Sequence, residues 1–242
     1  MNDTTMTIIS DRVGIQTISW GPWIEDLASV LESLCTLGYH GVEFAQPLRN
    51  LPSPDALRTL FASSGLTLLG LAGGDLMART AFGQHCQPLY LYADEWDQRG
   101  IDQARSNGLR VALHPHVFKG IGSIAVAAEK LDTSPDLSLI VDTAHVYLAG
   151  EDFVAETEKY LDRIIAVHLK DWNSSYGRGA NSFARGFTRL GRGELSDMIK
   201  RLVDLLLTHN YSGWVVVEQD TPEGDPLDCA AESRQWLRDL GV

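Results

Sequence analysis

The sequence has 242 residues, of which 44% are hydrophobic, and it carries a formal net charge of -12. This acidic balance repels phosphate groups and disfavours DNA or RNA as partners, and no apolar run approaches the roughly 20 residues of a membrane-spanning helix. The length suits one large α/β domain. Because no linker-like or low-complexity segment interrupts the chain, we expect a single domain over residues 1–242.

The cysteines favour a reducing compartment. Cys35, Cys86 and Cys229 are far apart and odd in number, which fits reduced thiols better than a disulfide framework. The first residues, MNDTTMTIISDR, lack the basic region and apolar stretch that are typical of a secretory signal. We therefore expect a cytoplasmic protein.

Apolar, β-rich runs alternate with amphipathic stretches along the chain. The predicted strands are 13–20, 40–45, 66–73, 88–96, 110–117, 137–146, 164–172 and 213–220. The predicted helices are 22–38, 54–65, 122–132, 151–162, 194–209 and 228–239. Nearly continuous apolar strands that alternate with helices are typical of a parallel sheet covered by helices, so the pattern predicts an α/β fold.

The segment 74–109 allows two interpretations. PLYLYADEW (88–96) reads as a fourth strand with little helical sequence around it, whereas AFGQHCQPLYLY (81–92) could be helical, with one strand lost. We prefer eight strands, because seven would leave an unpaired edge. The prediction is a (β/α)8 TIM barrel with shortened or missing helices around the third and fourth units. The Gly/Ser/Arg-rich segment 173–192 is expected to be a loop that closes over substrate.

Four polar strings close four of the apolar runs: Leu-His-Pro-His at 113–116, Asp-Thr-Ala-His at 142–145, His-Leu-Lys-Asp at 168–171 and Val-Glu-Gln-Asp at 217–220. In a barrel of parallel strands, active sites are built at the edge where the strands end. We therefore expect His114, Asp142, His168 and Glu218 to converge on one divalent metal ion. Such mixed nitrogen and oxygen ligands suit Mn²⁺, Co²⁺, Fe²⁺ or Zn²⁺, and suit Mg²⁺ less well.

Each candidate ligand also has an ordinary structural interpretation. A single His at a strand end is more often a hydrogen-bonded structural residue, Asp142 alone could cap a turn, and Glu218 alone could be the solvated end of an apolar strand. The coincidence of four candidate ligands at four strand ends favours the metal site.

Three nearby residues are candidates for proton transfer. His145 lies three residues beyond Asp142 and could bind substrate hydroxyls or move a proton, since the pKa of imidazole lies near neutrality. Lys170 could protonate a leaving hydroxyl or bind a substrate oxygen, or it could be a surface lysine. His116 could act as a base, or it could simply order a loop.

Two further residues are candidates for substrate binding. Glu43 ends the second predicted strand and could line the same mouth, or it could pair with Arg49. Trp20 ends the first predicted strand and could offer an apolar wall to a sugar-like ring, although packing in the core is the stronger alternative.

The strings VALHPHVFKGIGS, LIVDTAHVYLAGED, IIAVHLKD, GFTRLGRGEL and YSGWVVVEQDTPEGDPLDCAAESRQWL resemble the xylose-isomerase-like TIM-barrel superfamily of sugar isomerases and epimerases, and most of all its inosose dehydratase branch. The resemblance implies a divalent metal held by Asp142, His168 and Glu218. The fifth-strand ligand is usually a glutamate in the epimerases. The matching position here is His114, in a string similar to the run of histidines of the dehydratase branch, and either His114 or His116 could face the metal.

The resemblance also implies a reaction class. The epimerases move protons with two opposed glutamates, and this chain offers only Glu218, so elimination or one-sided proton transfer is favoured. We expect a metal-dependent lyase or isomerase that acts on a keto-polyol, such as an inosose or a ketose, through a metal-stabilised enediolate. The base would be Glu218, His116 or His145, and the acid Lys170. Mn²⁺ or Co²⁺ is the expected cofactor, and a homo-oligomer is compatible with the sequence.

The alternatives are an epimerase of the same superfamily, a non-catalytic barrel that serves as a subunit or scaffold, and a metal-dependent abasic-site endonuclease. The net charge of -12 argues against the endonuclease.

Overall fold

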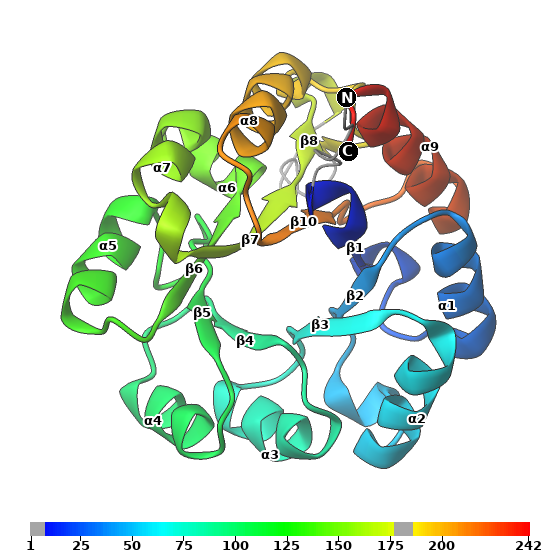
Figure 1. Cartoon of the computed structure of the whole chain (residues 1–242), viewed down its shortest axis with the longest axis vertical. Coiled ribbons are helices and arrows are strands. Elements are labelled where there is room, and N and C mark those ends of the chain that lie inside the picture. The colour runs from blue at the N-terminus through cyan, green and yellow to red at the C-terminus, as the bar shows by residue number, and fades with distance from the viewer. Residues whose placement is uncertain (1–7, 177–185) are drawn as a thin grey trace, which may run out of the picture.

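The computed structural model describes residues 8–176 and 186–242. Eight parallel strands form a closed barrel in the order β1-β10-β7-β6-β5-β4-β3-β2, with the helices arranged around it (Figure 1). The barrel strands are β1 (Val13–Gln16), β2 (Gly41–Phe44), β3 (Thr67–Leu71), β4 (Tyr90–Ala93), β5 (Val111–Leu113), β6 (Ser138–Asp142), β7 (Ile164–Leu169) and β10 (Trp214–Val217). The predicted TIM barrel is confirmed.

The helices cover the outer face of the barrel. They are α1 (Leu27–Thr36), α2 (Pro54–Ser64), α3 (Leu76–Cys86), α4 (Gln98–Ser106), α5 (Ile124–Thr133), α6 (Thr143–Leu148), α7 (Phe153–Lys159), α8 (Ser196–Thr208) and α9 (Pro226–Asp239). Most begin at a side chain that accepts a hydrogen bond from the first turn: Asp26 caps α1, Ser53 caps α2 and Asp225 caps α9. Among the described residues, no helix combines the length and the apolar character needed to cross a membrane.

The expectation of shortened or missing helices in 74–109 was wrong. Helix α3 has 11 residues, as many as α2, and α4 has 9. The buried face of α3 carries Arg79, Thr80 and Gly83, so its apolar pattern is weak. Helix α4 is amphipathic but buries mainly small residues, Gly100 and Ala104, beside Ile101. The segment 81–92 is divided between the end of α3 and the start of β4.

All eight barrel strands are shorter than predicted, and in β1 and β6 the last predicted residues begin a helical turn. Strand β1 ends at Gln16, and Thr17–Trp20 forms a 3-10 helix. Strand β6 ends at Asp142, whose carboxylate caps α6 by accepting bonds from the backbone N–H groups of Ala144 and His145. A capping aspartate of this kind stops a strand and starts a helix within one residue.

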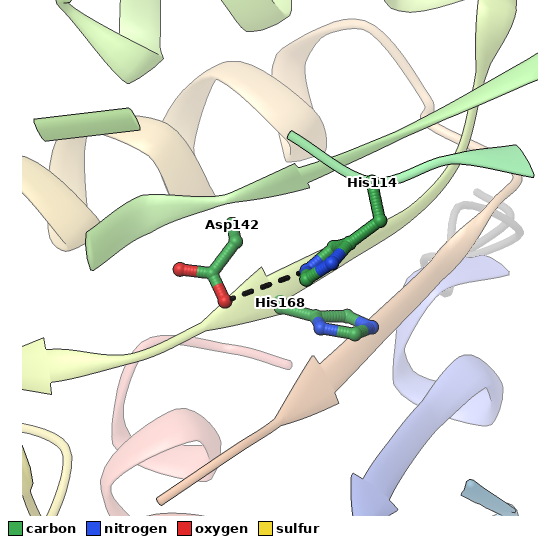
Figure 2. A group of neighbouring side chains, drawn as sticks. All are labelled: His114, Asp142 and His168. Carbon is green, nitrogen blue, oxygen red and sulfur yellow. Dashed lines mark ion pairs between the residues drawn. The ribbon is translucent and has the colours of Figure 1, made fainter. Parts of the chain in front are cut away.

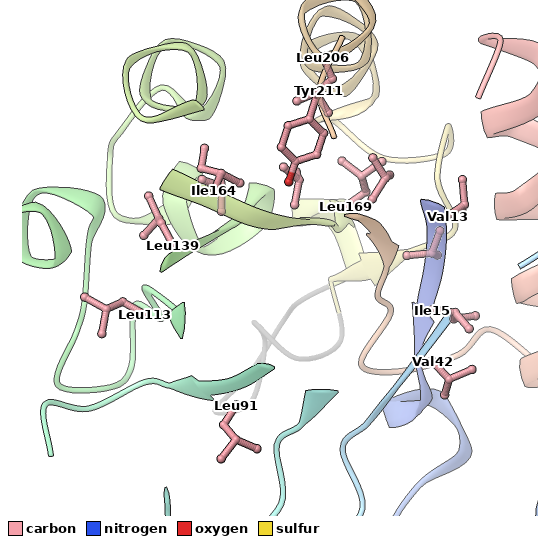
Figure 3. Packing of buried hydrophobic residues seen from close by; sticks show 14 of the residues in the cluster. Val13, Ile15, Val42, Leu91, Leu113, Leu139, Ile164, Leu169, Leu206 and Tyr211 are labelled. Atoms are coloured by element: carbon pink, nitrogen blue, oxygen red, sulfur yellow. The ribbon is translucent and has the colours of Figure 1, made fainter. Parts of the chain in front are cut away.

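The hydrophobic core has two layers, because side chains alternate along each strand. The outer layer lies between the strands and helices and includes Val42, Leu91 and Leu113 (Figure 3). The inner layer fills the barrel with Leu69, Tyr90, Tyr92, Ala112, Ile140, Ile165, Ala166, Trp214 and Val216. Gly14 and Gly41 leave room for Leu69, since a Cβ on them would lie 2.5 and 2.7 Å from its side chain.

A small antiparallel sheet follows β7. It pairs β8 (Asp171–Trp172) with β9 (Phe187–Thr188). The carboxylate of Asp171 accepts hydrogen bonds from the backbone N–H groups of Gly191, Gly193 and Leu195, so it organises the turn that leads into α8. The predicted substrate-closing loop 173–192 lies partly outside the described residues.

Candidate metal centre and active site

Four strand ends deliver the predicted ligands to the interior of the barrel. His114 directly follows β5, Asp142 ends β6, His168 lies near the end of β7, and Glu218 directly follows β10. The residues two positions earlier all belong to the inner layer of the core, namely Ala112, Ile140, Ala166 and Val216. Because side chains at positions i and i+2 of a strand share a face, the four polar side chains point inward as well.

The four side chains lie close together. Asp142 and His168 are direct partners in the ladder of β6 and β7, and one ligand atom each of His114, Asp142 and His168 lies within 4.8 Å of the others (Figure 2). His114 Nε2 is 3.8 Å from Asp142 Oδ2, and His168 Nδ1 is 2.6 Å from Glu218 Oε2. All four residues are at least 95% buried, with exposed fractions of 0 to 5%.

The atoms that face one another are suited to a metal ion. His114 Nε2, Asp142 Oδ2, His168 Nδ1 and Glu218 Oε2 are buried, and their charged neighbours among the described residues are one another and the Lys170 ammonium group, 3.3 Å from Asp142 Oδ2. Lone pairs that stay incompletely satisfied in such a buried cluster cost about 1–3 kcal/mol for each atom. A cation about 2.1 Å from each atom would satisfy all of them and would place them about 3–4 Å apart. Two nitrogens and two carboxylate oxygens form a donor set that suits Mn²⁺, Co²⁺, Fe²⁺ or Zn²⁺.

The structure distinguishes His114 from His116. The Nε2 atom of His114 points to Asp142, and its side chain is 4% exposed. His116 is half-buried, and its Nδ1 accepts a hydrogen bond from the backbone N–H of Phe118. Of the two candidates for the fifth-strand ligand, the structure therefore brings His114 into the cluster.

His116 and His145 form a stacked pair beside the cluster. Their ring centroids are 3.7 Å apart, with an angle of 34° between the planes. Burial, together with neighbouring positive groups that include the Lys170 ammonium, lowers the pKa of His116 to about 4 and that of His145 to about 3. Both imidazoles are therefore neutral at pH 7 and able to accept a proton.

Lys170 is a buried ammonium group, so its interpretation as a surface lysine was wrong. Its Nζ lies 2.8 Å from Glu218 Oε1, 3.0 Å from Asp220 Oδ1 and 3.3 Å from Asp142 Oδ2. Burial lowers the pKa of Lys170, but the three carboxylates outweigh burial and hold it well above its usual value. Lys170 also lies 3.4 Å from His145 Nε2, which links the ammonium group to the histidine pair.

Asp220 is a site residue that sequence reasoning missed. The pKa of its carboxyl group is raised to about 6, mainly by burial. The Lys170 ammonium lowers this pKa and the Glu218 carboxylate raises it. Because side chains alternate in an extended segment, a residue two positions after Glu218 points to the same face, and this spacing could have identified it.

Glu43 lies inside the barrel and not at its rim. Its carboxylate is fully buried, accepts hydrogen bonds from the hydroxyl groups of Tyr90 and Tyr92, and lies 3.1 Å from His168 Nε2. No ion pair joins Glu43 to Arg49 within the described residues, so that alternative was wrong. The position behind His168 gives Glu43 an imidazole partner and no exposed surface for substrate.

Asp94 was also missed from the sequence. It directly follows β4, and its Oδ1 lies 2.8 Å from His114 Nδ1. Burial raises the pKa of Asp94, but the hydrogen bond to His114 and the positive charges of His114, His116 and Arg79 together outweigh burial and lower the value to about 2. The sequence offered one signal, an acidic residue at the end of the neighbouring strand.

Trp20 packs against the core, which was the stronger of its two interpretations. It ends the 3-10 helix after β1, is partly buried and packs against the outer layer of the core. The structure gives it no contact with the cluster among the described residues, so its predicted contact with substrate stays a prediction.

The comparisons with known proteins agree with the barrel fold. A model of the xylose isomerase-like TIM barrel family matches residues 91–240, more than half of the chain. The chain belongs to the xylose isomerase-like TIM barrel family. The matched region of this family barrel contains Asp94, the four clustered residues and Lys170, whereas Glu43 lies outside it.

Two similar curated proteins are named inosose dehydratase. The protein from Halalkalibacterium halodurans is 36% identical over 147 residues, which are 55% of this chain and 48% of that protein. The protein from Lactiplantibacillus plantarum is 27% identical over 269 aligned positions, which cover 88% of each chain. This chain therefore spans about half the length of the first relative and most of the second.

The barrel is also similar to solved structures of low sequence identity. One of them is the IOLI protein with a binding zinc atom. It has a TM-score of 0.72 at 13% identity, and the similarity covers 95% of this chain and 98% of that chain. At such identity the similarity concerns the fold alone.

Proposed function

We propose that this protein is a divalent-metal-dependent enzyme that acts on a keto-polyol, and that its reaction is the loss of water from an inosose-like substrate. The single observation that carries the proposal is the buried cluster in which one ligand atom each of His114, Asp142 and His168 lies within 4.8 Å of the others, with Glu218 Oε2 2.6 Å from His168 Nδ1. The names of the relatives support the substrate class. The zinc atom of the IOLI protein, which has the same fold, supports the cofactor.

His114, Asp142, His168 and Glu218 would hold the metal. A bound divalent cation would supply Lewis-acid polarisation of the substrate carbonyl and the adjacent hydroxyl group. Mn²⁺ or Co²⁺ is our first choice, because two imidazoles with two carboxylates match these ions better than Mg²⁺.

The remaining residues would move the protons of an elimination. A base takes the proton on the carbon next to the carbonyl, the new C=C bond forms, and the β-hydroxyl leaves as water after it receives a proton. His145 and His116 are neutral and can accept the proton. Glu218 is a weaker candidate base, because Lys170 and His168 hold its pKa well below its usual value against the effect of burial.

Lys170 would provide the acid. It is kept as an ammonium group by the surrounding carboxylates, and Asp220, whose pKa is about 6, lies 3.0 Å away and can return a proton to it. General acids work best when their pKa lies near the working pH. The carboxylates that keep Lys170 charged also raise its pKa and weaken it as an acid, so the Asp220 carboxyl group is the better-matched proton source of the pair.

Elimination is favoured over symmetric epimerisation by the fifth strand. His114 stands at the position where the epimerases of this superfamily usually carry a second glutamate, and the described carboxylates nearest to it, Asp94 and Asp142, are engaged with imidazoles or Lys170. A two-base epimerisation needs an opposed pair, so we rank the epimerase second.

The test begins with metal content. Purified protein is expected to contain close to one divalent transition metal per chain, and Asp142→Ala or His168→Ala is expected to remove it. Asp197→Ala, on the exposed surface of α8, is the matched control for loss of an aspartate. A native protein without metal, indifferent to the two site variants, would support the scaffold alternative instead.

Product analysis then separates the reactions. Inososes and ketoses are supplied with Mn²⁺ or Co²⁺, and a product lighter than its substrate by the mass of one water indicates a dehydratase. Conserved mass with a new isomer indicates an isomerase or epimerase and overturns the elimination. Binding to DNA at low salt would revive the abasic-site endonuclease, which the net charge of -12 disfavours.

We also propose that the enzyme works in the cytoplasm. Cys35, Cys86 and Cys229 are all unpaired thiols, and two of them are buried. Unpaired cysteines are typical of reducing compartments.

A further inference from the structure

Each of the two histidines in the cluster has a carboxylate on its outer side. His114 Nδ1 lies 2.8 Å from Asp94 Oδ1, while its Nε2 points to Asp142. His168 is oriented in the opposite sense, with Nε2 3.1 Å from Glu43 Oε1 and Nδ1 facing Glu218. Every imidazole nitrogen of the pair therefore faces either the cluster or an outer carboxylate.

We propose that Asp94 and Glu43 are positioning residues that hold His114 and His168 in the tautomers needed for metal binding. The inference rests on the proposed metal centre and deepens it. It assigns Nε2 of His114 and Nδ1 of His168 as the metal-binding atoms.

The chemistry of imidazole supports this assignment. A neutral imidazole has one N–H donor and one nitrogen with a lone pair, and a carboxylate only accepts hydrogen bonds. Each ring nitrogen of the two histidines faces a carboxylate, but Asp142 and Glu218 are themselves proposed ligands on the cluster side, whereas Asp94 and Glu43 lie on the outer side. A metal bound in the cluster would take the lone pair of the inner nitrogen, so the single hydrogen of each neutral ring would lie on the nitrogen that faces Asp94 or Glu43.

The two carboxylates are themselves held in place. Glu43 accepts from the hydroxyl groups of Tyr90 and Tyr92, and Gln16 Nε2 donates to the hydroxyl oxygen of Tyr92 at 2.9 Å. These residues come from β1, β2 and β4, so Glu43 reaches His168 on β7 through the interior of the barrel.

Asp94 is fixed by its backbone. It follows β4 as His114 follows β5, and these strands are direct neighbours in the barrel. Its carbonyl oxygen accepts a hydrogen bond from Ile121 at 2.8 Å. The Asp94 side chain is 29% exposed, whereas that of Glu43 is fully buried. Asp94 can therefore be changed with less risk to folding, and it carries the main test.

The experiment measures Zn²⁺ binding by the full chain through competition with a chelator. Asp94→Ala is expected to weaken binding by about 10- to 100-fold, the usual effect of removing the carboxylate partner of a ligating histidine. Asp94→Asn keeps an acceptor oxygen and is expected to lie between wild type and Asp94→Ala. Glu95→Gln removes the same charge from the neighbouring residue, which makes no described contact with His114, and is expected to bind as wild type does.

A spectroscopic measurement separates positioning from general damage. In Zn²⁺-loaded protein with ¹⁵N-labelled histidine, the His114 ring is expected to show an N–H at Nδ1 and the His168 ring an N–H at Nε2. Asp94→Ala is expected to change the His114 signals and leave those of His168 in place, and Glu43→Gln is expected to do the reverse. If Glu43→Gln does not fold, the Asp94 variants still test whether an outer carboxylate sets the tautomer of its histidine.

The outcomes distinguish this inference from the proposed function. Wild-type protein that binds no divalent metal overturns both. Wild-type protein that binds Zn²⁺, together with an Asp94→Ala variant of unchanged affinity and unchanged His114 signals, overturns the positioning role alone. If Asp94→Ala and Glu95→Gln lose the same amount of Zn²⁺ affinity, the loss is due to net charge, and the positioning role of Asp94 is overturned.

Discussion

Strands β5, β6, β7 and β10 end in residues whose buried nitrogen and oxygen atoms face one another, whereas β2 and β4 contribute carboxylate and phenol groups that face the imidazoles from behind. The first group of strands lies within the region that matches the family model, and β2 lies before it. The difference teaches that the ligand atoms and the groups that orient them come from different strands, with the orienting residue Asp94 inside the matched region and Glu43 before it. Variants at the ligands and variants at the orienting groups should therefore differ in the size of their effects on metal binding and stability.

The largest effect is expected from Asp142→Ala. This change removes a ligand, the cap of α6 and one carboxylate partner of the buried Lys170. Breaking a buried ion pair from one side costs about 3–5 kcal/mol. Metal analysis should find no bound metal, and chemical denaturation should show a loss of this size. Asp142→Asn, which keeps the cap, should recover part of the stability and none of the activity. Full activity in either variant would contradict the proposed ligand.

Lys170→Met is expected to have the next largest effect. It leaves Asp142, Glu218 and Asp220 close together and buried without the ammonium group that they surround. We expect the metal-free protein to lose about 3–5 kcal/mol of unfolding free energy, and added Mn²⁺ to restore part of it. Denaturation curves without and with Mn²⁺ measure the loss of unfolding free energy and its recovery. A variant as stable as wild type without metal would show that the carboxylates do not depend on Lys170.

The pH dependence tests the two imidazoles together. Burial lowers the pKa of His114, but the carboxylates of Asp142 and Asp94 outweigh it and raise the value from 6.5 to about 9, and the pKa of His168 is raised as well, by Glu43 and Glu218. Metal ligands must lose their protons, so affinity is expected to rise with pH up to about 9, by about tenfold per pH unit for each proton displaced. Titrations of Mn²⁺ at four pH values measure the slope, and a flat profile would contradict it.

The raised pKa of His114 has the opposite consequence for the stability of the metal-free protein, which is expected to fall as the pH rises. A pKa that is raised on folding stabilises the folded state below the unfolded pKa of 6.5, and this contribution is lost as the pH rises through about 9. Metal-free protein should therefore lose stability on the alkaline side of neutrality while metal-loaded protein does not.

Tyr92→Phe is expected to have the smallest effect, because it changes the outer groups only. It removes one hydroxyl partner of Glu43 and leaves the amide of Gln16 without its acceptor. We expect a loss of about 1–2 kcal/mol in unfolding free energy and only a small, few-fold loss of metal affinity. Thermal denaturation and metal titration measure the two quantities. A loss of affinity as large as that of Asp142→Ala would show that the two groups of strands are not distinct.

The sequence by itself determined the barrel and the positions of the predicted ligands. Apolar runs that end in His114, Asp142, His168 and Glu218 predict their convergence, because parallel strands end at one edge of a barrel. The alternation of side chains along a strand is a local property, so it also predicts that these four side chains point into the barrel. The helices in 74–109 were harder to predict, because their buried faces use polar and small residues.

Only the tertiary structure decided which groups stand behind the ligands. Glu43 meets His168 across 125 residues of sequence, after a register shift between Val42 and Glu43 in the pairing with β3. The choice of His114 over His116 and the burial of Lys170 likewise depend on how the closed barrel brings strand ends together. Such contacts depend on barrel closure and register, which no local pattern of residues records.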